Sequence, residues 1–459
     1  MAPDKEGRFT TGSTMRHVVV MTTTASIGFL FLFLVDFLTL FYISLLRDVR
    51  LVAGVGLASF VQHIVSAVAI GLAVAATALV SRALGARDHA LARSRTTSCL
   101  TVSFLTLTAL AGLVFLFREE AVGLLMEPGP ATEVASRYLA WILPSLPVLG
   151  LGISTAAILR AEGDARRALI VTMVAGGVAF VLDPLVILGL GLGVDGAAWV
   201  LVFSRIVTAL VGLHYVVRTH ELAAPLRLAE TFHDFRAIFA VAGPAVLAQL
   251  STPSGFLLLA AWVGRFGDSA VAGWSVVTRM VVLGFSGIIA LAVAVGGIFG
   301  QNYGARKLHR LEATYRDSLV FAVLYALAAW GVLWLATDLI VWAFGMTGDG
   351  ARIVRAFCRL GAGGFVLAGA AYVATAAFNN LGRPIWATVL NWSRAGLAVP
   401  AMLFLLVGTL GGQAILYSLE GPGVVYAYAA GSSLAGVIGG FLGWRFVKEL
   451  TRNPPTPDS

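Results

Sequence analysis

Apolar runs long enough to cross a lipid bilayer recur along this chain, and they constrain its fold more than any other feature. The first extends from Val18 to Leu46 and contains one charged residue, Asp36. A membrane-spanning helix needs about 20 predominantly apolar residues. Within hydrocarbon the backbone must satisfy its own polar groups, and a helix does so within each apolar segment. We therefore expect an all-α membrane protein.

Twelve such runs are separated by charged or Gly/Pro-rich breaks. The chain is 58% hydrophobic and 12% charged, whereas soluble proteins have about 25% charged residues. Most of the 32 Lys and Arg fall in short loops. This pattern indicates orientation, with both termini cytoplasmic in the cell (inner) membrane, and not a nucleic-acid-binding surface. The predicted spans are 17–46, 52–81, 96–117, 134–159, 168–191, 194–217, 237–264, 270–301, 318–337, 353–379, 385–409 and 424–447.

The second half of the sequence repeats the first without a gap. VAGVGLA at 52–58 corresponds to VAGWSVV at 271–277, and SRALGAR at 81–87 corresponds to GQNYGAR at 300–306. Gly163 of RAEGDAR corresponds to Gly382 of NNLGRP at the same separation of 219 residues. Three matches at one separation predict two equivalent halves.

Each half contains six predicted spans, so both halves begin on the same side of the membrane. We expect an N-lobe at 1–218, a cytoplasmic linker at 219–236, and a C-lobe with a short tail at 237–459. Transporters with parallel repeats bind substrate between the halves and expose it alternately to the two sides. A channel is disfavoured because no filter-like loop or ring of pore-lining residues is visible.

The sequence resembles the multidrug and toxic-compound extrusion (MATE) family of antiporters. The resemblance rests on Asp36, the two GAR turns, RAEGDAR, and the stretch LDPLVILGLGLGVDGAA at 182–198. It implies twelve helices in two parallel, pseudo-symmetric six-helix lobes that form a V. It also implies export of organic compounds against inward H⁺ or Na⁺. Asp36 and Asp183 match the family's coupling carboxylates on the first and fifth helices.

The sequence departs from the family pattern at three places. Gly255 stands at the position equivalent to Asp36, where many members carry an acid in the seventh helix. Ala179 and Phe180 replace an Asn that often precedes the fifth-helix Asp. The first helix lacks the usual proline, although Thr22, Thr23 and Thr24 could bend it through hydroxyl bonds to preceding carbonyls. The first of these departures, the missing acid in the seventh helix, predicts coupling through the first half only.

Three charged residues of the first half lie at similar depths. Asp36, Asp183 and Arg205 are about 15, 12 and 16 Å from the outer ends of their spans, at 1.5 Å per residue. An ionisable group within a membrane normally pairs or lines a wet cavity. Two aspartates and one arginine leave one negative charge, which one H⁺ or Na⁺ would neutralise. We predict that this cluster is the cation-coupling site. The alternative is that Asp36 and Arg205 form a fixed ion pair that braces the helices.

Other polar residues within the spans are candidates for substrate contact. Their alternative roles are hydrogen bonding between helices and snorkelling of arginines to the membrane interface. The arginines of the second half have no acid predicted at their depth, which favours an anionic or zwitterionic substrate group. The candidates are Gln62, Gln249, Arg279, Asn391 and Arg394.

No enzyme signature is present. We find no phosphate-binding Gly-Lys-Ser/Thr loop and no ligand spacing typical of a metal site, so we predict no catalytic residue and no cofactor beyond the coupling ion. The expected partners are a small organic substrate and the lipid bilayer, with the protein as a monomer. Two rival functions stay open. One is a flippase for a lipid-linked or anionic amphipathic substrate, and the other is a non-transporting receptor or scaffold.

Overall fold

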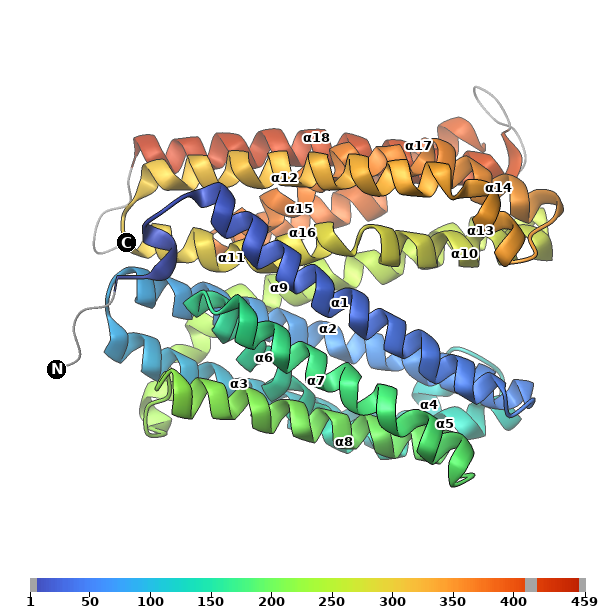
Figure 1. Cartoon of the computed structure of the whole chain (residues 1–459), viewed down its shortest axis with the longest axis horizontal. Helices are drawn as coiled ribbons and strands as arrows, with labels where there is room; N and C mark the ends of the chain where they lie inside the picture. Colours follow the sequence, from blue (N-terminus) through green and yellow to red (C-terminus); the bar gives the residue numbers. More distant parts are fainter. Residues whose placement is uncertain (1–5, 409–418, 454–459) are drawn as a thin grey trace. The chain divides into compact units, whose positions relative to one another are not determined.

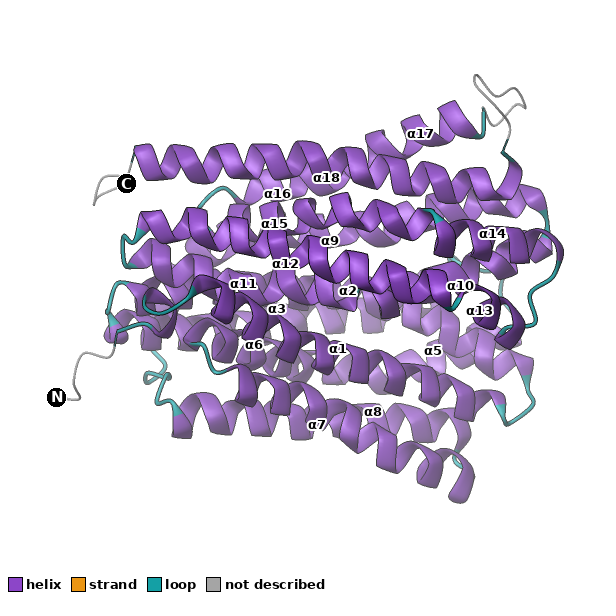
Figure 2. Cartoon of the chain, turned by 45° about the horizontal axis from the view of Figure 1, so that its top comes forward, coloured by secondary structure: helices purple, strands orange, loops and turns teal. Residues whose placement is uncertain are grey.

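The computed structural model describes residues 6–408 and 419–453, and the regular elements in these residues are all helical (Figure 2). Twelve helical segments are long and apolar enough to cross a membrane, which confirms the predicted fold class. The predicted end of span eleven at 409 and the tail at 454–459 lie outside the described residues. The helices labelled in Figures 1 and 2 are α1 (Thr14–Ser44), α2 (Val49–Gly85), α3 (His89–Leu116), α4 (Arg118–Gly123), α5 (Pro130–Ile142), α6 (Leu146–Glu162), α7 (Ala165–Asp183), α8 (Gly193–Leu213), α9 (Leu228–Val263), α10 (Asp268–Gly284), α11 (Ser286–Gly304), α12 (Leu308–Leu335), α13 (Thr337–Ala343), α14 (Gly348–Arg359), α15 (Phe365–Asn380), α16 (Pro384–Ser393), α17 (Val399–Leu406) and α18 (Glu420–Arg452).

The chain forms two compact units. The first contains Met1–Arg8 and Ile27–Val246, and the second contains Phe9–Ser26 and Leu247–Ser459. In the first unit α2 packs against α3, α5 and α6, and in the second α15 packs against α11, α12 and α18. The α15–α18 contact is close because Gly436 has no side chain. A Cβ atom there would lie 2.1 Å from the Leu367 carbonyl oxygen.

The backbone repeats itself as the sequence does. Arg87 and Arg306, at equivalent places in the two GAR turns, have positive φ angles of 62° and 56°. Gly163 and Gly382 have φ angles of 92° and 99°. The fourth and tenth spans are interrupted by short 3₁₀ turns at Leu143–Ser145 and Gly361–Gly364. The predicted repeat is therefore confirmed at the level of local conformation.

The predicted single span at 270–301 is wrong in one respect, because two helices, α10 and α11, occupy it. The helix breaks at Phe285, between Gly284 and Gly287. The hydroxyl of Tyr325 donates to the Gly284 carbonyl (3.1 Å) and accepts from the Gly287 amide (3.2 Å). Backbone groups freed at a break within a membrane need such partners. Tyr325 thus stabilises the break by pairing backbone groups that would be costly to leave unpaired.

The segment predicted as a linker at 219–236 is partly helical, because α9 begins at Leu228. Pro225 lies in the extended part before it, where its missing N–H opposes a helix. The extended part is docked on α3. Thr97 donates to the Ala224 carbonyl (2.9 Å) and accepts from its amide (3.0 Å), and Arg95 pairs with Asp234 (3.3 Å). This connection is therefore held against the first unit.

The segment before α1 is anchored in the second unit. Phe9 is 2% exposed, and its amide donates to the side chain of Gln301 (2.9 Å). The Arg310 guanidinium donates to the carbonyls of Phe9 (2.9 Å), Thr11 (3.2 Å) and Gly12 (2.9 Å). One cation thus satisfies three carbonyls that a short non-helical segment cannot pair internally.

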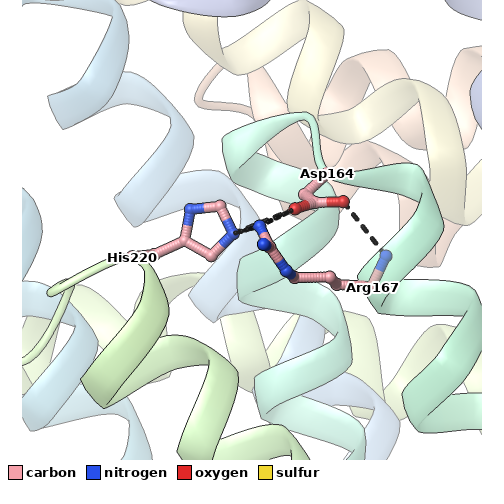
Figure 3. A network of polar contacts seen from close by, with 3 residues as sticks. All are labelled: Asp164, Arg167 and His220. Carbon is pink, nitrogen blue, oxygen red and sulfur yellow. Dashed lines mark hydrogen bonds and ion pairs between the residues drawn. The ribbon is translucent and has the colours of Figure 1, made fainter.

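A polar network holds the turn between α6 and α7 (Figure 3). Asp164 caps α7 by accepting from the Arg167 amide (3.0 Å), and its other oxygen accepts from the Arg167 guanidinium (2.7 Å). His220 reaches the same carboxylate oxygen (3.0 Å). Burial raises the pKa of Asp164, but these hydrogen bonds outweigh it, so the pKa lies below its ordinary value. The charged carboxylate therefore stabilises the folded protein.

We predict that Arg310→Ala loosens the segment before α1. Hydrogen bonds to a charged donor contribute about 1.5–3 kcal/mol each, so the loss of three should speed amide hydrogen exchange at residues 7–13 by at least tenfold. Hydrogen exchange of the purified protein with mass spectrometry measures this effect. His309→Ala, an exposed side chain on the same helix, is the control. Equal exchange in both variants and the wild type would contradict the anchor.

We predict that the stabilising effect of Asp164 depends on pH. Because its pKa is lowered by folding, the contribution is present above the unfolded value of about 4 and is lost as the pH falls through the folded value. Asp164→Asn should therefore lower the melting temperature at pH 7, and the difference from wild type should shrink at pH 3–4. Asp88→Asn is the control, because Asp88 caps α3 (2.8 Å) without an ion pair among the described residues. A constant difference between pH 3 and 7 would refute this role.

Candidate functional site

Asp36 lies in the middle of α1, and its side chain is exposed on the surface of the first unit. It forms no hydrogen bond or ion pair with any residue that the structure describes. It does interact electrostatically with His63 on α2 and with Arg205 on α8. The ring of His63 bonds through Nδ1 to the Ser59 carbonyl (2.7 Å), so Nδ1 is the donor in this contact. Asp36 is thus a carboxylate without a direct partner.

Asp183 is the last residue of α7 and is 2% exposed. The hydroxyl of Thr39 donates a short hydrogen bond to Asp183 Oδ2. Thr39 lies three residues after Asp36, so both side chains lie on one face of α1. Asp183 also interacts electrostatically with Asp36. The first helix therefore brings one carboxylate of its own and one hydroxyl to the end of α7.

The chain changes conformation directly after Asp183. Pro184 begins a π-helix, Pro184–Gly189, which replaces the regular helix there. Single-turn π segments are rare and are frequent at functional sites. The local sequence Asp-Pro explains the change, because proline cannot donate to the helical ladder. The position of Asp183 at this junction is set by the sequence itself.

Arg205 on α8 is 5% exposed and lies close to the break in span four. Its Nη1 donates to the Ile142 carbonyl (3.0 Å) and to the Ser145 hydroxyl (2.6 Å). Its Nε has no hydrogen-bond partner in the described part of the chain. No carboxylate of the described chain lies within 4.0 Å of its nitrogens, so the structure contains neither an Asp36–Arg205 nor an Asp183–Arg205 ion pair. Arg205 instead braces the broken span.

Asp36 interacts electrostatically with both Arg205 and Asp183, and it pairs directly with neither. Tyr138 on α5 interacts electrostatically with all three. With both aspartates charged, the group has one excess negative charge, carried by oxygen atoms of Asp36 and Asp183. Carboxylate and hydroxyl oxygens suit a proton or a hard cation such as Na⁺. The described residues contain no cluster of three or more His, Cys, Asp or Glu that could hold a metal ion. The role of Asp36, Asp183 and Arg205 in cation coupling stays a prediction.

The sequence reasoning missed four neighbours of the charged residues: His63, Thr39, Tyr138 and Ser145. The spacing Asp36-x-x-Thr39 was a usable signal, because it places the hydroxyl beside the carboxylate on one helical face. Pro144 was a second signal, because it predicts the break at which Ser145 and the Ile142 carbonyl meet Arg205. The contacts of Tyr138 and His63 depend on helix packing and left no signal in the sequence.

The five residues predicted to contact substrate are dispersed. Gln62 is half-buried on α2 in the first unit, whereas Gln249 on α9 and Arg279 on α10 are exposed in the second. The Asn391 amide donates to the Thr375 hydroxyl (3.1 Å) and to the Ala387 carbonyl (2.8 Å), so it joins α16 to α15. Arg394 is 7% exposed. None of the five lines the apolar hollow that Val178, Leu182 and Phe203 form on α7 and α8.

Comparisons with known proteins agree with this arrangement. The family model described as MatE matches residues 24–185 and 244–404, one segment in each half. A FAD transporter of Shewanella oneidensis is 26% identical over 62% of this chain and 64% of its own length, which is less than two thirds. The multidrug export protein MepA of Staphylococcus aureus (strain MSSA476) is 22% identical over 86% of this chain and 87% of its own.

Solved structures share the whole fold. The outward-facing conformation of a multidrug resistance MATE family transporter of the MOP superfamily superimposes with a TM-score of 0.90 at 23% identity, over 98% of this chain and 99% of that chain. At this identity the likeness shows the two-lobe, twelve-helix fold alone. The family model, in contrast, matches well over half of the sequence. This chain is therefore an integral, multi-pass membrane protein that belongs to the MatE family.

Proposed function

We propose that this protein is a secondary active exporter of organic, amphipathic compounds, coupled to inward movement of H⁺ or Na⁺ through Asp36 and Asp183. Membership of the MatE family supports export, and the relative MepA is a multidrug export protein. The observation that carries the coupling site is the unpaired state of Asp36. A charge of this kind within a span is costly and is normally retained for function.

A single coupling cation would change the charge of the site from −1 to zero. The fixed charge of Arg205 favours ionised aspartates, whereas their mutual repulsion and their low-dielectric surroundings favour uptake of a cation. The two aspartates would titrate as one coupled group. Arg205 donates hydrogen bonds to the Ile142 carbonyl and the Ser145 hydroxyl and pairs with neither acid, so we propose that it acts as a constant countercharge.

Cation binding can drive export only if it favours one conformation over another. Thr39 on α1 is bonded to Asp183 at the end of α7. A cation bound between Asp36 and Asp183 would therefore attract one carboxylate on each of the two helices. Loss of the cation would leave the two carboxylates repelling each other. Parallel repeats with six spans each favour alternating access between the two halves. In the proposed cycle, the binding and release of one cation is coupled to the change between the two conformations, one of which binds the substrate.

We further propose that the protein is a monomer in the bacterial inner membrane with both termini in the cytoplasm. Clustering of Lys and Arg in the loops of one side supports this orientation. A flippase for an anionic amphipathic substrate is the second candidate, because Arg394 is a buried cation without an acidic partner among the described residues. A water-soluble probe enclosed in the lumen of vesicles separates the two candidates. An exporter moves such a compound across the membrane, and a lipid flippase does not.

We predict that the purified protein in proteoliposomes transports a fluorescent amphipathic carboxylate or zwitterion, with the cation ethidium tested in parallel, when a pH gradient or a Na⁺ gradient is imposed. The ion whose gradient drives accumulation is the coupling ion, since the −1 site can take either. Fluorescence quenching of each probe in vesicles records the transport, and vesicles without protein give the background. Transport of equal rate with no gradient of either ion would contradict a coupled exporter.

We predict that Asp36→Asn and Asp183→Asn each reduce gradient-driven transport by at least about tenfold, which corresponds to roughly 1.4 kcal/mol. Asparagine keeps the size and hydrogen bonding of the side chain but cannot supply the charge. Asp48→Asn is the matched control, because Asp48 only caps α2 by accepting from the Arg50 amide (2.9 Å) and lies beside the Arg50 side chain (3.9 Å). Full transport by both variants, at wild-type levels in the membrane, would remove these residues from the mechanism.

A further inference from the structure

The second unit contains a buried cation of its own. Arg394, at the start of the π-helix Arg394–Ala398 in span eleven, is 7% exposed. Its partners are neutral hydroxyls: Nη1 donates to Tyr372 (3.3 Å) and Nη2 donates to Thr252 (3.2 Å). No Asp or Glu of the described chain lies within 4.0 Å of it. A buried charge that lacks an opposite charge lowers the stability of the fold, so its presence favours a functional role.

The repeat shows what is missing beside Arg394. Gly255 occupies the position in the second half that Asp36 occupies in the first. A Cβ atom on Gly255 would lie 3.5 Å from the Cβ of Ala395, the residue next to Arg394. The place where the first unit carries a carboxylate thus has no charge in the second unit, and it lies against the residue that follows the arginine. The space tolerates a side chain, since 3.5 Å is ordinary van der Waals contact.

One aromatic side chain lies against the same arginine, and an aromatic cluster lies near it. The Arg394 guanidinium lies 5.5 Å from the ring centre of Tyr372. Tyr428 on α18 interacts electrostatically with both residues. The Tyr428 ring lies 5.9 Å from that of Phe256 and 6.1 Å from that of Trp274. Tyrosine and tryptophan present large apolar faces together with polar edges. The surroundings of Arg394 therefore suit a flat, aromatic molecule as well as an anion.

We propose that Arg394, Tyr372, Thr252 and Tyr428 form a subsite for the anionic group of an aromatic substrate, a carboxylate or a phosphate. The guanidinium binds either group through two parallel hydrogen bonds, and the aromatic side chains contact the ring system. The proposal rests on the proposed exporter function and adds its substrate class. The competing role for Arg394 is a brace between α9, α15 and span eleven, which needs no ligand.

The test compares four probes with one ring system: 1-naphthoate, 1-naphthyl phosphate, 1-naphthalenemethanol and 1-naphthylmethylammonium. Binding to the full-length protein in lipid nanodiscs is measured by calorimetry, without any ion gradient. We expect one or both anionic probes to bind at least tenfold more tightly than the alcohol, and the preferred anion identifies the group. Equal affinity for all four probes overturns the proposal without any variant.

Variants then locate the subsite. Arg394→Gln should weaken binding of the preferred anion at least tenfold and leave the alcohol within twofold, whereas Arg394→Lys should retain a several-fold preference for the anion. Arg359→Gln, which removes an exposed arginine lying 3.7 Å from Asp338, should change nothing. An equal loss for anion and alcohol in Arg394→Gln supports a brace only and overturns the subsite. Anion binding without gradient-driven transport would instead refute the exporter and leave the subsite standing.

Discussion

A charged side chain within a membrane-spanning segment is costly, and the first unit places three of them, Asp36, Asp183 and Arg205, in its spans. Arg205 is the constant positive charge, held by a carbonyl and a hydroxyl at the break in span four. Asp183 is held by Thr39, and Asp36 has no direct partner among the described residues. One positive charge therefore faces two negative ones. The break, the π-helix after Asp183 and the face of α1 all serve to bring these groups within range of one another.

The two units share a backbone plan but differ in charge. Equivalent positive φ angles at Arg87 and Arg306, and interruptions in the fourth and tenth spans, show that the halves fold alike. In the first unit, Asp36, Asp183 and Arg205 together carry one excess negative charge. In the second, Arg394 lacks an acid and Gly255 replaces the aspartate. This difference supports our proposal that one half binds the cation and the other binds an anionic group of the substrate.

Much of this fold was predictable because hydrocarbon leaves few choices. Apolar runs of 20 residues fold as helices, and a repeat of 219 residues predicts two equivalent halves. Helix breaks were predictable only where proline signals them, as at Pro144. The break at Phe285 depends on Tyr325, a residue 40 positions away, and the docking of the connection onto α3 depends on Thr97. Such contacts come from tertiary packing, which periodicity does not reveal.

The site was predictable in part for the same reason. A lone carboxylate in an apolar run identifies Asp36 and Asp183 without any structure, because its cost must be offset. The partners were not predictable. Arg205 points to backbone and hydroxyl groups rather than to either acid, and side-chain direction depends on neighbouring helices. Arg394 and Asn391 were equal candidates for substrate contact in the sequence. In the structure, Asn391 donates hydrogen bonds to the neighbouring helix and to its own helix, whereas Arg394 is a buried cation.

The most direct measurement is infrared difference spectroscopy of the protein in lipid, titrated with pH and then with Na⁺. If the excess negative charge resides on Asp36 and Asp183, the wild type should show a carboxylic-acid band that converts to carboxylate with rising pH, or a carboxylate band that shifts with Na⁺. That signal should be missing from the Asp36→Asn/Asp183→Asn double variant. Identical spectra for the two proteins across the titration would contradict the account, because they would place cation binding elsewhere.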